Sequence, residues 1–110
     1  MTLVNLTPHP LNLVLDESTT IALAPSGTVA RCAVTRSTVG EVNGIPVNRT
    51  SFGAVEGLPG PVPGTYYIVS ALVAQAVPGR ADVLITDDAV RDDAGRIIGC
   101  RALATLSPDF

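Results

Sequence analysis

The stretch from Gly64 to Ile85 most constrains the fold, because only here does a strand pattern run directly into a helix pattern. Thr65 to Val69 is rich in β-branched and aromatic residues, which favour strands. Ser70 is a good N-cap residue, and no helix breaker follows it before Pro78-Gly79. The last four residues of the stretch again have a strand pattern. The stretch therefore predicts a strand, one short helix near residues 70–77 and a second strand.

Turn residues divide the rest of the chain into short strand patterns, with ten Gly and nine Pro among 110 residues. Asn43-Gly44 is the strongest hairpin signal, and we expect a short arm on each side of it. Two prolines in Thr7-Pro8-His9-Pro10 interrupt any ladder, so we expect a hairpin with Leu3–Leu6 and Leu11–Leu15 as its arms. The remaining strand patterns are Ile21–Ala24, Thr28–Thr35 and Arg96–Leu106.

These patterns predict one compact domain over residues 1–110 with an α+β fold. We expect mostly short antiparallel β-strands in a small barrel or two-layer sheet, together with the one short helix, because a single helix cannot cover an extended sheet. Apolar residues make up 46% of the chain but aromatic residues only 4%, so the core must be built from Val, Leu, Ile and Ala.

Charge and hydropathy argue against several classes of partner. All seven basic residues are Arg, they are spread along the chain, and the net charge is −3, so we expect no nucleic-acid binding. We see no signal-peptide pattern and no apolar run of membrane-spanning length, and therefore expect no membrane contact and a cytoplasmic location. Cys32 and Cys100 are far apart in sequence; we expect reduced, at least partly buried thiols, with a disulfide as the alternative.

The sequence offers little for catalysis or metal binding. His9 is the only histidine, so a His-rich zinc site is excluded, and we expect no metal and no cofactor. A nucleophilic site would also have to use His9, and no Gly-x-Ser-x-Gly motif is present, so we expect no enzymatic activity. The acidic pairs Asp87-Asp88 and Asp92-Asp93 fall in predicted turns, where carboxylates are normally solvated. Asp82 is expected to pair with Arg80 and brace the loop between them.

Arginine is the dependable cation of this chain, because Lys is absent. Four arginines interrupt or flank strand patterns: Arg31, Arg49, Arg91 and Arg101. Such arginines are either solvated and ion-paired, or they converge into a clamp for phosphate or carboxylate. Ser70 would either cap the helix or help to bind an anion there. Tyr66 and Tyr67 point to opposite faces, so one of them can stack on a base. With His9, these residues form the candidate ligand site.

Several ordered blocks resemble small uncharacterised proteins encoded by phages and prophages. The blocks are NLTPHP, GTVAR, VGEVNGIPV, GTYYIVSALVAQAVPGRADVL and GRIIGCRAL, and the likeness covers nearly the whole chain. The resemblance implies a viral protein that acts in the host cytoplasm. Small phage proteins of this size include inhibitors of host defence that sequester nucleotide second messengers, so the resemblance implies an anti-defence role of this kind.

Three functions follow as expectations. The first is a non-enzymatic protein that binds a small anionic ligand, with a nucleotide second messenger as the candidate. The second is a structural or protein-interaction accessory module, which predicts an exposed apolar patch without a deep pocket. The third is a small nucleotide hydrolase, which needs a general base beside the ligand. We also expect a homo-oligomer, because short edge strands and a mean hydropathy of +0.39 leave surface for self-pairing to cover.

Overall fold

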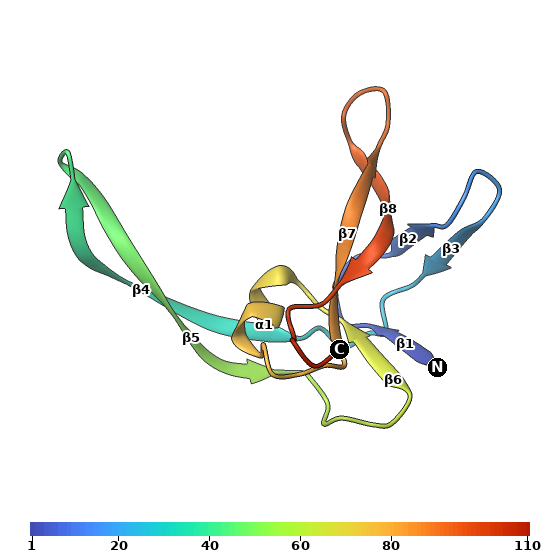
Figure 1. Cartoon of the computed structure of the whole chain (residues 1–110), viewed down its shortest axis with the longest axis horizontal. Coiled ribbons are helices and arrows are strands. Elements are labelled where there is room, and N and C mark those ends of the chain that lie inside the picture. Colours follow the sequence, from blue (N-terminus) through green and yellow to red (C-terminus); the bar gives the residue numbers. More distant parts are fainter.

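The computed structural model describes all 110 residues and shows a curled sheet, one helix and a long projecting hairpin (Figure 1). The elements are β1 (Thr2–Asn5), β2 (Leu11–Val14), β3 (Thr20–Leu23), β4 (Arg31–Val42), β5 (Ile45–Glu56), β6 (Thr65–Ile68), α1 (Ala71–Ala76), β7 (Val83–Arg91) and β8 (Ile97–Ala104). The expectation of a mostly β fold with one short helix is therefore confirmed. With a single six-residue helix, the term α+β overstates the helical part.

The strand–helix–strand unit forms as the sequence predicts. β6 and β7 lie side by side in parallel, with Tyr67 opposite Val83. A parallel pair needs a crossover connection, and α1 supplies it. Ser70 caps the helix: its backbone is extended, and its Oγ accepts a hydrogen bond from Val73 N at 3.4 Å.

Six strands form one mixed sheet in the order β1-β6-β7-β8-β2-β3, while β4 and β5 pair only with each other. The sheet curls so far that its two edge strands approach each other. Ser26 N, just after β3, donates a hydrogen bond of 2.9 Å to the Asn5 carbonyl of β1. The result is a nearly closed, barrel-like sheet. The expected antiparallel arrangement holds for only half of the strand pairs, since β1–β6, β6–β7 and β2–β8 run parallel.

The predicted hairpin between the first two strands is wrong. β1 pairs in parallel with β6, whereas β2 pairs with β3 and, at Leu13 opposite Cys100, with β8. Pro8 and Pro10 have no N–H to donate, so the segment between the strands cannot start a two-stranded ladder. It carries the chain from one side of the curled sheet to the other.

The hairpin at Asn43-Gly44 is confirmed, but its arms are much longer than expected. Asn43 and Gly44 both have positive φ, at 52° and 78°, as a two-residue hairpin turn requires. Each strand has twelve residues, because the Thr and Val residues that flank the turn favour extended backbone despite their polar neighbours. We call residues 33–54 the arm and the rest of the chain the body; Figure 1 shows the arm projecting away from the body.

One of the two predicted acidic turns is wrong. Residues 86–88 lie inside β7, where only Asp88 departs from extended geometry, with φ of 55°. The chain reverses instead at the second predicted turn, where Gly95 N donates to the Asp92 carbonyl at 2.9 Å. Asp92 also fixes this turn with its side chain, which accepts hydrogen bonds from Ala94 N and Arg96 N. The β7–β8 hairpin is consequently longer than the sequence indicates.

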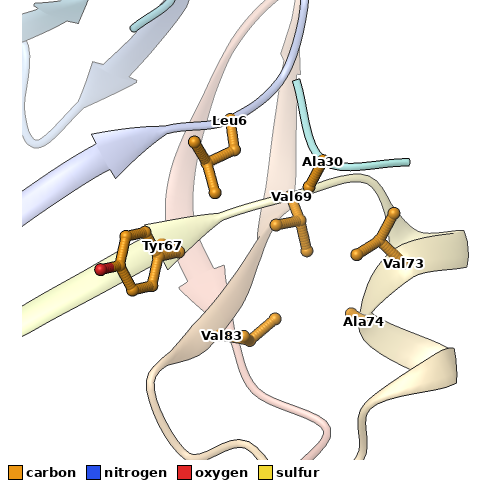
Figure 2. Close-up of a cluster of buried hydrophobic side chains, with 7 residues drawn as sticks. All are labelled: Leu6, Ala30, Tyr67, Val69, Val73, Ala74 and Val83. Carbon is orange, nitrogen blue, oxygen red and sulfur yellow. The ribbon is translucent and has the colours of Figure 1, made fainter. Parts of the chain in front are cut away.

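The core lies between α1 and the sheet (Figure 2). Its seven side chains come from the chain near β1, the residue before β4, β6 and the residue after it, α1 and β7: Leu6, Ala30, Tyr67, Val69, Val73, Ala74 and Val83. Thirteen residues of the chain are buried, and every one of them belongs to the body. No helix of the chain is long and apolar enough to cross a membrane.

Arg80 and Asp82 form the expected ion pair and brace a loop. The Arg80 guanidinium donates two hydrogen bonds of 2.8 Å to the Asp82 carboxylate and a third, of 2.9 Å, to the Pro59 carbonyl. This ties the irregular segment 57–64 to the start of β7. The hydrogen bond from Arg80 lowers the pKa of Asp82 below its ordinary value, and the same bond raises the pKa of Arg80.

Both cysteines are free thiols, as expected. Cys100 is buried, and Cys32 is half-buried at the base of the hairpin, where it packs against the core. The Cys32 Sγ donates weakly to carbonyls of its own hairpin, at 3.4 Å to Ala33 and 3.6 Å to Gly53. Both thiols therefore serve as small packing groups of the body.

Candidate functional site

The turn Thr7–Pro10 is held from behind by one buried asparagine. Asn5 is 1% exposed, and its Nδ2 donates to the carbonyls of His9 at 2.8 Å and Leu23 at 3.1 Å. Its Oδ1 accepts from Thr7 N at 3.0 Å and from Thr7 Oγ1 at 2.7 Å. Every hydrogen-bonding atom of the Asn5 amide is thus engaged, and the turn is fixed in one shape. Because Leu23 ends β3, the same amide also helps to close the curled sheet.

Two adjoining hollows lie on either side of this turn. They share Thr7, Pro8 and Ser70, and their volumes are about 250 and 410 Å³. The smaller is completed by Leu6, Val29, Ala30, Arg31, Cys32, Leu72 and Val73. The larger is completed by His9, Leu11, Val69, Ala71, Ile85 and Thr86. The turn, the start of β4, the start of α1 and the middle of β7 thus meet at one place.

Arg31, His9 and Ser70 are the predicted site residues that the structure brings together. Arg31 and His9 are exposed, and neither side chain has a hydrogen-bond or ion-pair partner in the protein. Ser70 lines both hollows, although the hydrogen bond that its Oγ accepts from Val73 N identifies it first as the helix cap. The helix has less than two turns and contributes only a small dipole, so any charge-based attraction for an anion must come from Arg31.

The other three arginines line neither hollow, so no second arginine converges with Arg31 into a clamp at this site. Arg91 donates a 2.8 Å hydrogen bond to the Gly95 carbonyl and serves its own hairpin turn. Arg101 lies 3.9 Å from an Asp88 carboxylate oxygen. Arg49 lies on the arm, opposite Ser37. Alternation assigns each arginine to one face of its strand but does not show which distant strands become neighbours. The sequence therefore could not show that Arg31 alone would lie beside the turn.

The tyrosines lie elsewhere. Tyr67 is 4% exposed and belongs to the core, so it cannot stack on a ligand. Tyr66 points to the opposite face, as alternation requires, and meets the Phe110 ring edge-on at 5.9 Å between centroids. Tyr66 lines a separate hollow beside the Arg80–Asp82 pair. Neither tyrosine lines a hollow with Arg31, so the structure does not bring a tyrosine to the cluster of Arg31, His9 and Ser70.

The two hollows offer few kinds of chemical group. No carboxylate lines either hollow, so His9 has no acidic partner to orient or activate it. Cys32, the only thiol nearby, lines the smaller hollow, whereas His9 lines the larger one. No group of three or more His, Cys, Asp or Glu side chains could hold a metal ion. The available groups are one cation, one imidazole and several hydroxyls around an apolar floor.

Asn5 and Thr7 frame the turn, and the site predicted from the sequence did not include them. The signal that could have identified them is their spacing: an Asn side chain readily accepts a hydrogen bond from the backbone N–H two residues later. The prolines that follow make such a turn the favoured conformation.

Comparison with protein-family models, curated proteins and solved structures gives no significant match.

Proposed function

We propose that the protein binds a small anionic ligand, without transforming it, in the double hollow beside the turn Thr7–Pro10. One observation carries the proposal. Arg31 is an unpaired cation at the rim of a site built from four separate segments, where His9 and Thr86 supply further polar groups. The volumes of about 250 and 410 Å³ suit a ligand of metabolite size.

The resemblance to phage proteins suggests the class of ligand. A nucleotide-derived signalling molecule carries phosphates, which an arginine binds well, and an apolar base or sugar face that the floor of the hollows could hold. In this proposal the protein acts as an anti-defence factor by sequestering the signal. Sequestration needs affinity and no chemistry, which agrees with a site that has no paired acid and base.

Calorimetric titration with ADP-ribose derivatives and cyclic dinucleotides tests this proposal. For a compound that binds, we expect Arg31→Ala to weaken binding by about 10- to 100-fold, because a hydrogen bond to a charged group contributes about 1.5–3 kcal/mol. Arg101→Ala is the matched control, since Arg101 lies outside both hollows. We expect less than about a twofold change for it, as for a remote surface site. If none of these compounds binds, the signal-sequestering role is lost; if both variants bind equally well, the site is wrong.

A second candidate function has its own observation. A structural or protein-interaction module should expose apolar side chains, and the arm does so at Val42, Ile45 and Phe52. Such a module would use the arm to bind protein and would leave the hollows empty. A nucleotide hydrolase has less support, because the one histidine lacks a carboxylate partner.

A further inference from the structure

The arm is a long hairpin that its own chain does not cover. Every residue from 33 to 54 is exposed, and only the base of the hairpin, at Cys32 and Val55, packs against the core. Figure 1 shows the twisted pair of strands extending from the body beside α1. An isolated two-stranded hairpin is marginally stable in water, and both outer edges carry unpaired backbone groups. The arm therefore needs a partner to stay ordered over its full length.

The arm has apolar surface on both of its faces. Val42 lies opposite Ile45 at the tip, and Val47 follows Ile45 on the same face. These three side chains are 61%, 65% and 41% exposed. On the other face, nearer the body, Val34 lies opposite Phe52, with exposures of 40% and 41%. This distribution suits a hairpin that is enclosed on two sides, as an arm inserted into an assembly would be.

The exposed area of the whole chain has the size expected of a subunit. Its accessible surface is 7241 Å², about 1,500 Å² more than the roughly 5,700 Å² expected for a monomer of 11.3 kDa. Its radius of gyration is 16.4 Å, against about 13 Å for a compact domain of this length. A standard interface buries about 800 Å² on each partner. The surplus is therefore large enough for one stable interface or two.

Charge favours a second copy of this chain as the partner. The arm contains Arg36, Arg49 and Glu41, a net charge of +1, and the whole chain has −3, which leaves −4 on the body. The body also exposes apolar side chains, Ile97 and Ile98, on the β7–β8 hairpin. An apolar, slightly basic arm and an apolar, acidic body are complementary, so the arm of one copy suits the body of another.

We propose that the arm packs on the body of a second copy, and that arm-to-body contact is the main interface of a homo-oligomer. If the arm of each copy meets the body of the next, the contacts close into a dimer or a ring. This inference is independent of the ligand proposal, because the arm residues that carry it line neither hollow beside the turn.

Light scattering after gel filtration tests the assembly without ligand. We expect the parent protein to show a multiple of 11.3 kDa at micromolar concentration. The double variant Ile45→Thr and Val47→Thr should raise the dissociation constant about tenfold or more, because it makes the centre of the interface polar. Ile21→Thr with Val62→Thr is the matched control: it replaces one Ile and one Val of comparable exposure, 46% and 51%, outside the arm.

Both double variants keep β-branched side chains, so the strands should still form, and circular dichroism checks this. A parent protein that stays at 11.3 kDa at every concentration overturns the inference, and the arm must then serve a different protein. An oligomer whose dissociation constant the arm variant leaves unchanged also overturns it. The parent measurement needs no mutation, so a variant that fails to fold does not leave the question open.

Discussion

The body and the arm are made of similar strands, yet they place their apolar side chains in opposite environments. In the body, β6, β7 and α1 enclose Tyr67, Val69 and Val73 almost completely. In the arm, longer strands with comparable Val and Ile content bury nothing. Alternation of apolar and polar residues therefore shows which residues share a face of a strand. It does not show whether the same chain covers that face.

The largest expected difference between the two regions concerns two asparagines. Asn5→Ala removes four hydrogen bonds at a buried site in the body and leaves backbone groups unpaired. We expect the free energy of unfolding to fall by about 3–4 kcal/mol. Asn48→Ala removes one exposed hydrogen bond in the arm, which Asn48 Oδ1 accepts from Thr38 Oγ1. This change should lower the free energy of unfolding by less than about 0.5 kcal/mol.

Urea denaturation at one fixed protein concentration measures both asparagine variants. Equal losses would mean that the arm contributes as much to stability as the closed sheet does. That result would contradict the conclusion that the body is stabilised by its own buried contacts and the arm is not.

Two glycines with the same backbone conformation differ in their surroundings, one at the junction between arm and body and one at the arm tip. Gly57, where the chain returns from the hairpin to the body, has φ of +78°, and a Cβ there would lie 2.5 Å from the Val29 carbonyl oxygen. Gly44, at the arm tip, has the same φ but open space around it. We expect Gly57→Ala to lower the free energy of unfolding by about 2–4 kcal/mol, and Gly44→Ala by about 1 kcal/mol. Thermal unfolding of the two variants measures the difference, and matching midpoints would show that the close approach has no consequence.

A smaller effect should appear in acid, and only in the body. The pKa of Asp82 is lowered by the hydrogen bond from Arg80, so the unfolded chain binds a proton more readily than the folded one. The stabilisation is therefore present above the ordinary pKa of 3.8 and is lost as the pH falls from there through the lower folded value. Asp82→Asn should lower the free energy of unfolding by about 1–2 kcal/mol at pH 7.

The acid effect is checked by thermal unfolding between pH 7 and pH 2.5. The gap between the midpoints of the parent protein and the Asn variant should narrow as the pH falls below about 4. A constant gap across this range would mean that the ion pair does not set the acid response of the body.

The sequence predicted well those features that depend on neighbouring residues. The helix after Ser70, the Asn43-Gly44 turn and the Arg80–Asp82 pair each follow from a few adjacent side chains, and each is found. The free thiols of the cysteines are also found. The residues that form a turn or a helix cap are close neighbours in the sequence, so these features can be predicted without knowledge of the fold.

The features that failed depend on distant pairings. β1 pairs with β6 instead of β2, and no local pattern shows which strand will lie alongside. The position of Arg31 also depends on a distant contact: the Ala30 N–H donates a hydrogen bond to the Leu6 carbonyl at 3.0 Å, which holds the start of β4 next to the turn. Long-range contacts of this kind select one site residue among several with identical local patterns.

Backbone hydrogen exchange of the parent protein at high and low concentration tests whether the arm is ordered by contact with a second copy. Amides of β6 and β7 should stay protected at both concentrations, because the chain's own core stabilises them. Amides of the arm, residues 33–54, should be protected in the concentrated sample and should exchange rapidly after dilution below the dissociation constant. Arm amides that keep the same protection at every dilution, or that exchange rapidly even in the concentrated sample, would contradict the account.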